Sequence, residues 1–294
     1  MSKSSGPILV PIGFTDQSII ALEQAINIAN ITNSELFLLT VIEEPSAIQK
    51  LFVEYKDSLE KLKNEVRIKI EKIQETKCNV LKRDSDCMVS VGKIYEEIVR
   101  VSDMIGASLI VMGTDGTPKD KKKKFIGSNA YNVVRSAHCP VITIKGKVHR
   151  SGCKKIILPL DLHKETKEKV TTAIAYARLW NSEIHVFSVH NDNNEEIKLK
   201  LTRNLNQVKN FILDKGIKCS SALVNHDKLN LSEKVIDYSI DLNSDLIIIM
   251  TQQESDFKRY FLGSTASSII NNSDTPVMSI RPVKKLDTTS YELQ

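Results

Sequence analysis

The sequence predicts an α/β protein made of two successive domains, each a doubly wound parallel sheet with helices on both faces. Three observations support this fold class. Strand-like apolar runs alternate with stretches of helical periodicity along the chain. The runs at 8–12 and 109–112 are continuously apolar, which is typical of strands buried on both faces. The pattern of the first half then returns in the second half.

The repeat is visible residue by residue. ILVPI at 8–12 reappears as IILPL at 156–160, and the GS pair at 127–128 reappears at 263–264. A repeat of about 140 residues has the size of a domain and is too long for a solenoid unit. The sequence therefore indicates a duplicated domain.

We expect one domain over residues 1–146, a second over 153–283, and a polar tail over 284–294. The segment between the domains contains two glycines and no apolar pattern, as expected of a linker.

Each half alternates strands and helices in the same order. In the first half, strands are expected at 8–12, 36–41, 87–91, 108–112 and 140–144, separated by helices at 16–30, 46–75, 94–105 and 127–137. In the second half, strands are expected near 156–160, 184–189, 218–223, 245–250 and 276–280. In the first half, the helix expected at 46–75 should bury one stripe of apolar residues. These residues are Leu51, Val53, Leu59, Leu62, Val66 and Ile70.

Composition narrows the function classes. The 294 residues carry a net charge of +5, which is too small for a polycation and does not favour nucleic acid as a partner. There is no apolar signal segment and no run of about 18–20 apolar residues, so we expect no membrane partner and a cytoplasmic protein. The five cysteines form no CxxC pair, and reduced thiols are the expected state.

A glycine-rich segment is the main candidate site. The strand 109–112 ends in Gly113-Thr-Asp-Gly116, and Gly127-Ser128 then opens a helical pattern. A strand, a glycine loop and a helix N-terminus together allow backbone N–H groups to hold an anion, usually phosphate. The alternative, that the glycines serve only for turning, stays open on the local motif.

Each group of charged residues inside this segment allows two interpretations. The lysines at 121–124 are either a solvated loop or a source of attraction for a triphosphate, with one or two contacts at most. Asp115 and Asp120 are either turn residues or ligands for Mg²⁺.

No catalytic group can be named. The six histidines show no metal-ligand spacing and are interpreted as structural or surface residues. No residue corresponds to the water-positioning group or arginine finger of efficient phosphoryl-transfer enzymes. We expect no enzyme, or at most a slow ATPase.

These features together resemble a tandem universal stress protein. Both copies begin with an apolar strand that ends in proline, and the first carries LIVMGTDG followed by GS and closes with CPVITI. The resemblance implies a five-stranded flavodoxin-like (Rossmann-like) sheet of order 3-2-1-4-5 in each half, with ligands beyond the carboxyl ends of the strands at the switch point.

The resemblance also implies ATP, with or without Mg²⁺, as a bound ligand. Adenine and ribose would lie near Pro11, Gly13 and Val41, and phosphates near Gly113. The remaining implied contacts are Met112, Gly116, Gly127, Ser128 and the backbone of Asn129. Two features depart from the family pattern. Gly13 stands where ATP-binding members have Asp, and the second glycine interval is ten residues instead of nine.

The second half departs in the opposite way. Asp161 occupies the expected Asp position, and Gly263 and Ser264 keep the helix start, so these three form a degenerate second site. Aligned on the threonines, Met250 and Gln253 replace the paired glycines. We expect their side chains to fill the space where backbone would approach phosphate, with loss of nucleotide binding or binding of another polar ligand.

The last strand of each half is an apolar edge that needs a partner. In the resembled family such strands pair antiparallel between subunits, so we expect 141–144 to pair with 277–280 in a pseudo-two-fold intramolecular dimer, with further homodimerisation open. The function predicted is a stress-response protein that binds ATP in its N-terminal domain as a regulatory ligand and acts on an unknown protein partner. The alternative is a nucleotide-independent interaction protein, and the absence of Asp at position 13 favours it.

Overall fold

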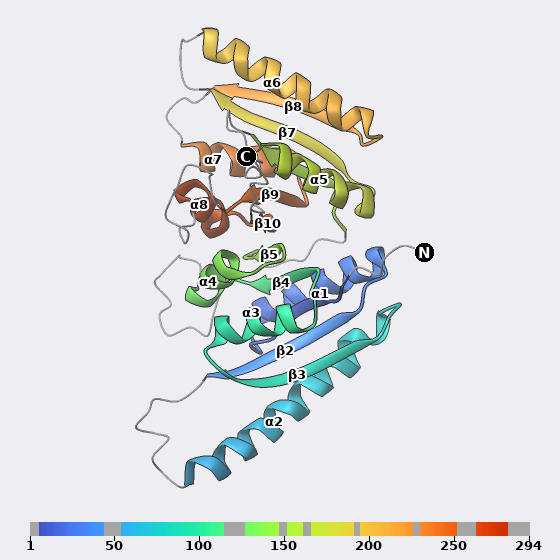
Figure 1. Cartoon of the computed structure of the whole chain (residues 1–294), viewed down its shortest axis with the longest axis vertical. Coiled ribbons are helices and arrows are strands. Elements are labelled where there is room, and N and C mark those ends of the chain that lie inside the picture. The colour runs from blue at the N-terminus through green and yellow to red at the C-terminus, as the bar shows by residue number, and fades with distance from the viewer. Residues whose placement is uncertain are drawn as a thin grey trace, which may run out of the picture.

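One sheet runs through the whole molecule (Figure 1). The computed structural model describes residues 6–43, 54–114, 127–146, 152–160, 166–190, 195–225, 230–251 and 263–281. Within them, ten strands follow the order β3-β2-β1-β4-β5-β10-β9-β6-β7-β8. The order is palindromic, and each half has the predicted sequence 3-2-1-4-5, which confirms two flavodoxin-like halves.

The elements of the first half alternate as predicted. They are β1 (Ile8–Pro11), α1 (Asp16–Thr32), β2 (Leu36–Glu43), α2 (Glu54–Lys77), the short 3₁₀ helix η2 (Cys78–Val80), β3 (Ser85–Gly92), α3 (Ile94–Met104), β4 (Leu109–Gly113), α4 (Ser128–Ser136) and β5 (Val141–Ile144).

The second half repeats this order. Its elements are β6 (Lys155–Pro159), α5 (Thr166–Trp180), β7 (Glu183–His190), α6 (Glu195–Asp214), β8 (Cys219–Asn225), α7 (Leu231–Asp241), β9 (Leu246–Met250), α8 (Ser264–Asn272) and β10 (Val277–Ile280).

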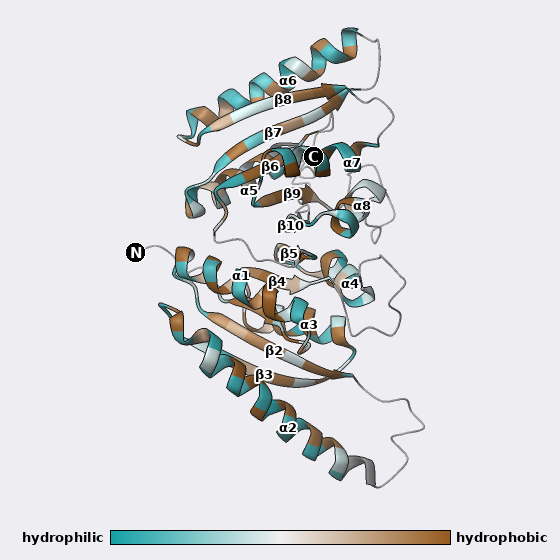
Figure 2. Ribbon diagram, turned by 180° about the vertical axis from the view of Figure 1, so that it is seen from behind, coloured by the Kyte–Doolittle hydropathy of each residue, from teal (hydrophilic) through white to brown (hydrophobic). Residues whose placement is uncertain are grey.

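Two hydrophobic layers cover the two faces of the sheet, and each runs through both halves. One layer contains residues of α1, α2, α5 and α6, and the other contains residues of α3, α4, α7 and α8. Alternate side chains of each strand enter opposite layers, so the central strands are apolar on both faces. Figure 2 shows this as brown central strands between more mixed helices.

The two halves meet through their last strands. β10 pairs antiparallel with β5, with Met278 opposite Ile142, and this confirms the predicted edge pairing. The contact is reinforced by two equivalent bonds. Lys145 Nζ donates to the carbonyl of Asn271 in α8, and Arg281 Nη1 donates to that of Ser136 in α4 at 3.2 Å. Each half therefore supplies a cation to a helix C-terminal end of the other, where the helix dipole favours it.

Helix α2 differs from its prediction. Ile70 is fully buried, but Leu62 is 43% exposed and Leu59 and Val66 are half-buried. Leu51 and Val53 lie outside the described residues. In Figure 1 the N-terminal part of α2 projects away from β3, so only its C-terminal turns reach the sheet. The stripe was predicted too long because helical periodicity does not show where the supporting sheet ends.

Candidate functional site

The predicted apolar contacts lie on one face of the sheet at its carboxyl edge. Met112 of β4 belongs to the layer shared with α3 and α4, and Val41 of β2 packs against it. Pro11 follows Leu9 of the same layer by two residues, so it projects to the same face. Pairing of β1 with β4 is described for Ile8 and Leu9, whereas pairing with β2 continues to Pro11. The three residues therefore lie on neighbouring strands at the switch point.

The turn after β1 leaves room at its glycine. A Cβ built on Gly13 meets nothing within 4 Å, and its φ is not in the left-handed region. The next residue, Phe14, adopts φ 55° and is 40% exposed. A non-glycine residue in this conformation costs of order 1 kcal/mol or more and often marks a functional site. Nothing in the sequence pattern predicts this strained, exposed aromatic side chain.

Thr15 fixes the end of this turn. Its hydroxyl accepts from the Ser18 N–H at 3.2 Å, and its own N–H donates to the Ser18 hydroxyl at 3.1 Å. This capping box satisfies the first turn of α1 from within the chain.

Gly113 has a packing role that the sequence did not reveal. A Cβ there would lie 3.0 Å from the Cβ of Gln17 and 3.1 Å from its backbone carbonyl. The glycine therefore lets the end of β4 approach α1, on the face opposite Met112. Gln17 Nε2 in turn donates to the carbonyls of Lys145 and, at 3.3 Å, Gly146. A Cβ on Gly146 would lie 2.6 Å from the carbonyl oxygen of Asp274, so the linker packs tightly against the second half.

The start of α4 is the predicted anion-binding element. The Gly127 N–H donates to the Thr114 carbonyl at 2.8 Å, which joins the two ends of segment 115–126. Among the described residues, no side chain caps this helix start, in contrast to α1. Ser128 is exposed and Asn129 is half-buried. Because the first N–H groups of a helix have no partner inside the helix, this end can accept an anion. Gly116, Asp115, Asp120 and the lysine run lie outside the described residues.

A comparison with protein families accounts for this arrangement. The model of the universal stress protein family matches residues 5–145 and 227–281, which is more than half of the chain. The chain belongs to the universal stress protein family.

Individual relatives agree with this assignment. The universal stress protein MJ0577 of Methanocaldococcus jannaschii is 29% identical over 162 residues, covering 50% of this chain and 99% of the relative. MJ0531 of the same organism is 31% identical over 144 residues, covering 47% of this chain and 81% of the relative. A universal stress protein structure from Archaeoglobus fulgidus matches the fold with a TM-score of 0.71 at 20% identity, covering 95% of this chain and 97% of that one.

The second half of this universal stress protein keeps the loop closure. Thr251 N–H bonds to the Ile280 carbonyl at 3.0 Å, as Thr114 N–H bonds to that of Ile144. The Gly263 N–H donates to the Thr251 carbonyl at 3.3 Å, and α8 starts at Ser264 without a side-chain cap. These contacts support the alignment of the two threonines. Asp161, Gln252 and Gln253 lie outside the described residues.

The side chain of Met250 does not point to the face of the sheet that we expected from the sequence. It pairs with Ile280 as Gly113 pairs with Ile144, so the alignment is right. However, Ile249 belongs to the layer under α7 and α8, and the next side chain along the strand projects to the opposite face. The expectation that Met250 fills the space on the phosphate side is therefore wrong, because alternation along β9 turns it toward the α5 face.

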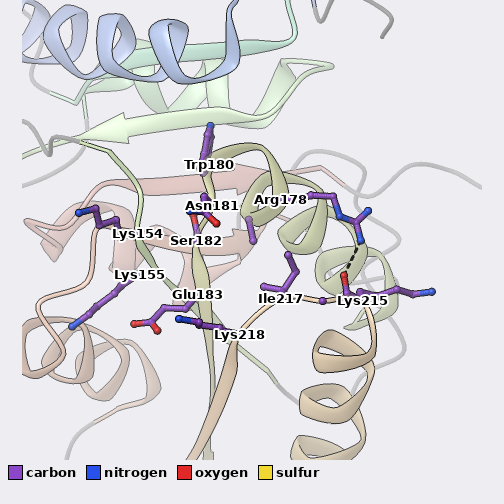
Figure 3. Close-up of a pocket in the computed structure, with 12 residues that line it drawn as sticks. Lys154, Lys155, Arg178, Trp180, Asn181, Ser182, Glu183, Lys215, Ile217 and Lys218 are labelled. Atoms are coloured by element: carbon purple, nitrogen blue, oxygen red, sulfur yellow. Dashed lines mark hydrogen bonds between the residues drawn. The ribbon is translucent and has the colours of Figure 1, made fainter. Parts of the chain in front are cut away.

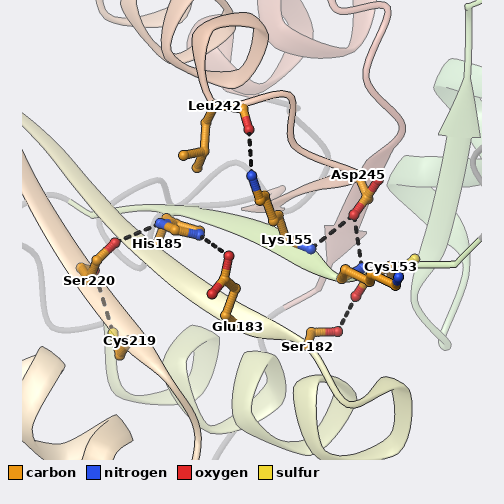
Figure 4. Close-up of polar contacts among 10 residues, drawn as sticks. Cys153, Lys155, Ser182, Glu183, His185, Cys219, Ser220, Leu242 and Asp245 are labelled. Carbon is orange, nitrogen blue, oxygen red and sulfur yellow. Dashed lines mark hydrogen bonds and ion pairs between the residues drawn. The ribbon is translucent and has the colours of Figure 1, made fainter.

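The structure brings together a polar trio that the sequence did not show. His185 Nδ1 lies 2.6 Å from the Ser220 hydroxyl, and Nε2 lies 3.1 Å from Glu183 Oε1 (Figure 4). His185 and Ser220 face each other across β7 and β8, and Glu183 precedes His185 by two residues. A cross-strand pair of this kind satisfies a buried histidine. The trio lies at the amino end of β7, away from the proposed nucleotide site.

The thiols of this universal stress protein are not activated. Burial raises the pKa of Cys153 to about 12 and the pKa of Cys78, Cys139 and Cys219 to about 11. Raised pKa values keep these groups as weakly reactive thiols. Within the described ranges, no group of three or more His, Cys, Asp or Glu could hold a metal ion. No helix among the described residues has the length and apolar character of a membrane span.

Proposed function

We propose that this universal stress protein binds ATP in an N-terminal domain covering residues 1–146 and uses it as a regulatory ligand, with little or no hydrolysis. The start of α4 is the observation that supports this most. Its uncapped N–H groups lie at the carboxyl edge of the sheet, beside the switch point between β1 and β4. Residues 153–283 form the degenerate partner domain in this proposal, and the protein is cytoplasmic.

The nucleotide would contact an apolar surface and a helix N-terminus at this edge of the sheet. Pro11, Val41 and Met112 offer an apolar surface for adenine on the face covered by α3 and α4. Ser128 and the Asn129 backbone would receive phosphate oxygens at the helix start, where the dipole favours negative charge. Mg²⁺ would enter with the phosphates.

A regulatory role follows from the connections of this edge. The Gly127 N–H bonds to the Thr114 carbonyl, so phosphates at the start of α4 would bind beside a direct link to the end of β4. In this proposal the nucleotide is a ligand and not a substrate. Nucleotide binding would then change the surface offered to a protein partner.

Substituting Gly127→Val is expected to abolish ATP binding, because a branched side chain at the helix start blocks the approach of phosphate. Calorimetric titration of Mg-ATP into nucleotide-stripped protein should give one nucleotide per chain for the wild type and none for the variant. Gly263→Val, at the same position in the second half, is the matched control and should leave the stoichiometry unchanged. If Gly263→Val lost ATP binding and Gly127→Val kept it, the nucleotide would lie in the second half and the proposal would be contradicted.

Gly13→Asp is expected to raise ATP affinity about tenfold, because it supplies a carboxylate that accepts a hydrogen bond from the nucleoside. The open space around Gly13 means that the side chain requires no rearrangement. The titration should be run beside Gly13→Ala, which adds a Cβ without an acceptor and should bind like the wild type. Equal affinities in all three proteins would show that Gly13 lies outside the nucleotide site.

The alternative function is that of an interaction protein that binds no nucleotide. The packing of Gly113 against Gln17 favours it, since that glycine has a structural reason to be present. In this case no adenine nucleotide would give heat or raise the midpoint of thermal unfolding.

A further inference from the structure

A cation-lined hollow of about 600 Å³ lies at the amino edge of the second half. It is bounded by the C-terminal end of α5, by the turn between α6 and β8, and by residues at the starts of β6 and β7 (Figure 3). The proposed nucleotide site lies at the carboxyl edge of the other half. The hollow is therefore separate from it and does not depend on it.

The charge of the hollow is strongly unbalanced. Five cationic side chains line it: Lys154, Lys155, Arg178, Lys215 and Lys218. Among the described residues, Glu183 is the one carboxylate in the lining, and its Oε1 lies 3.1 Å from Nε2 of His185. Figure 3 shows Lys154 and Lys155 on one side of the hollow and Arg178 and Lys215 on the other. Cationic residues therefore border the hollow on two sides.

Helix ends account for part of this charge. Arg178 Nη2 donates to the Lys215 carbonyl at 3.0 Å, and Lys155 Nζ donates to the Leu242 carbonyl at 3.2 Å. Both bonds place a cation near a helix C-terminus, which is a common structural arrangement. Lys154 and Lys218 precede strands, where no helix dipole calls for a positive charge.

The duplicated fold provides an internal comparison for Lys218. Its carbonyl accepts the Ile184 N–H at 2.9 Å, as the Asp84 carbonyl accepts the Leu36 N–H at 3.3 Å. The two residues thus occupy the same position in the two halves. The second half carries a positive charge where the first half carries a negative one.

Two further positions differ in the same direction. Arg178 lies three residues before Asn181, which has φ 53°, and Asn30 lies three residues before Asn33, which also has φ 53°. Lys154 directly precedes Lys155, whose carbonyl accepts the Asp245 N–H at 2.9 Å, as Gly6 directly precedes Pro7, whose carbonyl accepts the Ser108 N–H at 3.0 Å. The fold therefore does not require cations at these positions, because the first half adopts it with asparagine and glycine.

We infer that this hollow binds a compact oligophosphate, an anion with several phosphate groups in a short chain. Lysine and arginine are the side chains that bind phosphate oxygens most strongly, and cations on two sides suit a ligand with charge at both ends. The volume lies in the range of small-molecule sites. Lys218 and Arg178 would contact the phosphate oxygens of this anion.

Inorganic tripolyphosphate is the direct probe of this site. Calorimetry on the full chain should show one tripolyphosphate per chain, with affinity falling as salt is added. The variant Arg178→Asn/Lys218→Asp carries the residues of the first half, so it is expected to fold. We expect its affinity to be at least about tenfold lower, because two charge-assisted contacts are lost.

A control variant with the same change in net charge distinguishes binding in the hollow from general electrostatic attraction to the protein. Lys200→Asp/Arg203→Asn makes the same change in net charge on the exposed side of α6. It should leave tripolyphosphate affinity unchanged. Equal weakening in both variants, or no binding to the wild type, would overturn the inference.

A second experiment distinguishes an inorganic phosphate chain from a nucleoside polyphosphate. ATP and tripolyphosphate are titrated into Gly127→Val protein, which lacks the proposed nucleotide site but keeps the hollow. Tighter binding of tripolyphosphate supports an inorganic chain, and tighter binding of ATP supports a nucleoside polyphosphate. Amide signals of Ser182 and Gly216 should shift on addition of either ligand. Shifts confined to other parts of the chain would contradict the site.

Discussion

Replacing Ile142 with aspartate is expected to remove at least about 3 kcal/mol from the free energy of unfolding, because an unpaired carboxylate would be buried at the centre of the sheet. The side chain is fully buried and lies between Val111 of β4 and Met278 of β10. The β5–β10 contact joins the two halves, so one substitution should destabilise both.

Urea unfolding followed by circular dichroism measures this loss. Ile142→Val keeps an apolar group and is expected to cost only about 1 kcal/mol. A variant Ile142→Asp with a wild-type unfolding midpoint would show that the two halves do not depend on this contact.

Gly113→Val is expected to destabilise the protein by about 2–3 kcal/mol in the absence of any nucleotide. The new side chain would meet Gln17, whose backbone carbonyl is already 3.1 Å from an ideal Cβ and cannot rotate away. The free energy of unfolding of ligand-free protein is the quantity to measure.

Gly13→Ala is the matched control for this prediction, since a Cβ at Gly13 meets nothing within 4 Å. Its unfolding midpoint should stay close to that of the wild type. If Gly113→Val were equally stable and lost only ATP affinity, the glycine would serve the ligand and not the packing of α1.

The fold could be predicted from the sequence to a large extent. Buried parallel strands are apolar on both faces, and this made segments such as 108–112 easy to recognise. The pairing of β5 with β10 followed from an apolar edge that appears twice in one chain. The exposed start of α2 could not be foreseen, because amphipathic periodicity is the same whether or not a sheet lies beneath it.

The sequence predicts which apolar residues of the candidate site share one edge of the sheet, but it does not predict the contacts of the glycines. Sequence placed Pro11, Val41 and Met112 together, and strand alternation in the structure gives them one face. The role of Gly113 depends on a contact with Gln17, and the direction of Met250 depends on strand register; neither can be read from glycine spacing. The left-handed conformation of Phe14 costs free energy at the turn, and the amino-acid sequence pattern does not predict it.

The joining of β5 to β10 within one polypeptide also removes a dependence on concentration. Two separate subunits meeting through such strands would dissociate on dilution, whereas here the partner strand is always tethered. A symmetric dimer of identical subunits must accept every substitution twice, once in each copy. A fused pair carries each substitution once, so one half can keep its glycine-rich sequence between β4 and α4 while the other acquires Lys154 and Lys218 at the opposite edge.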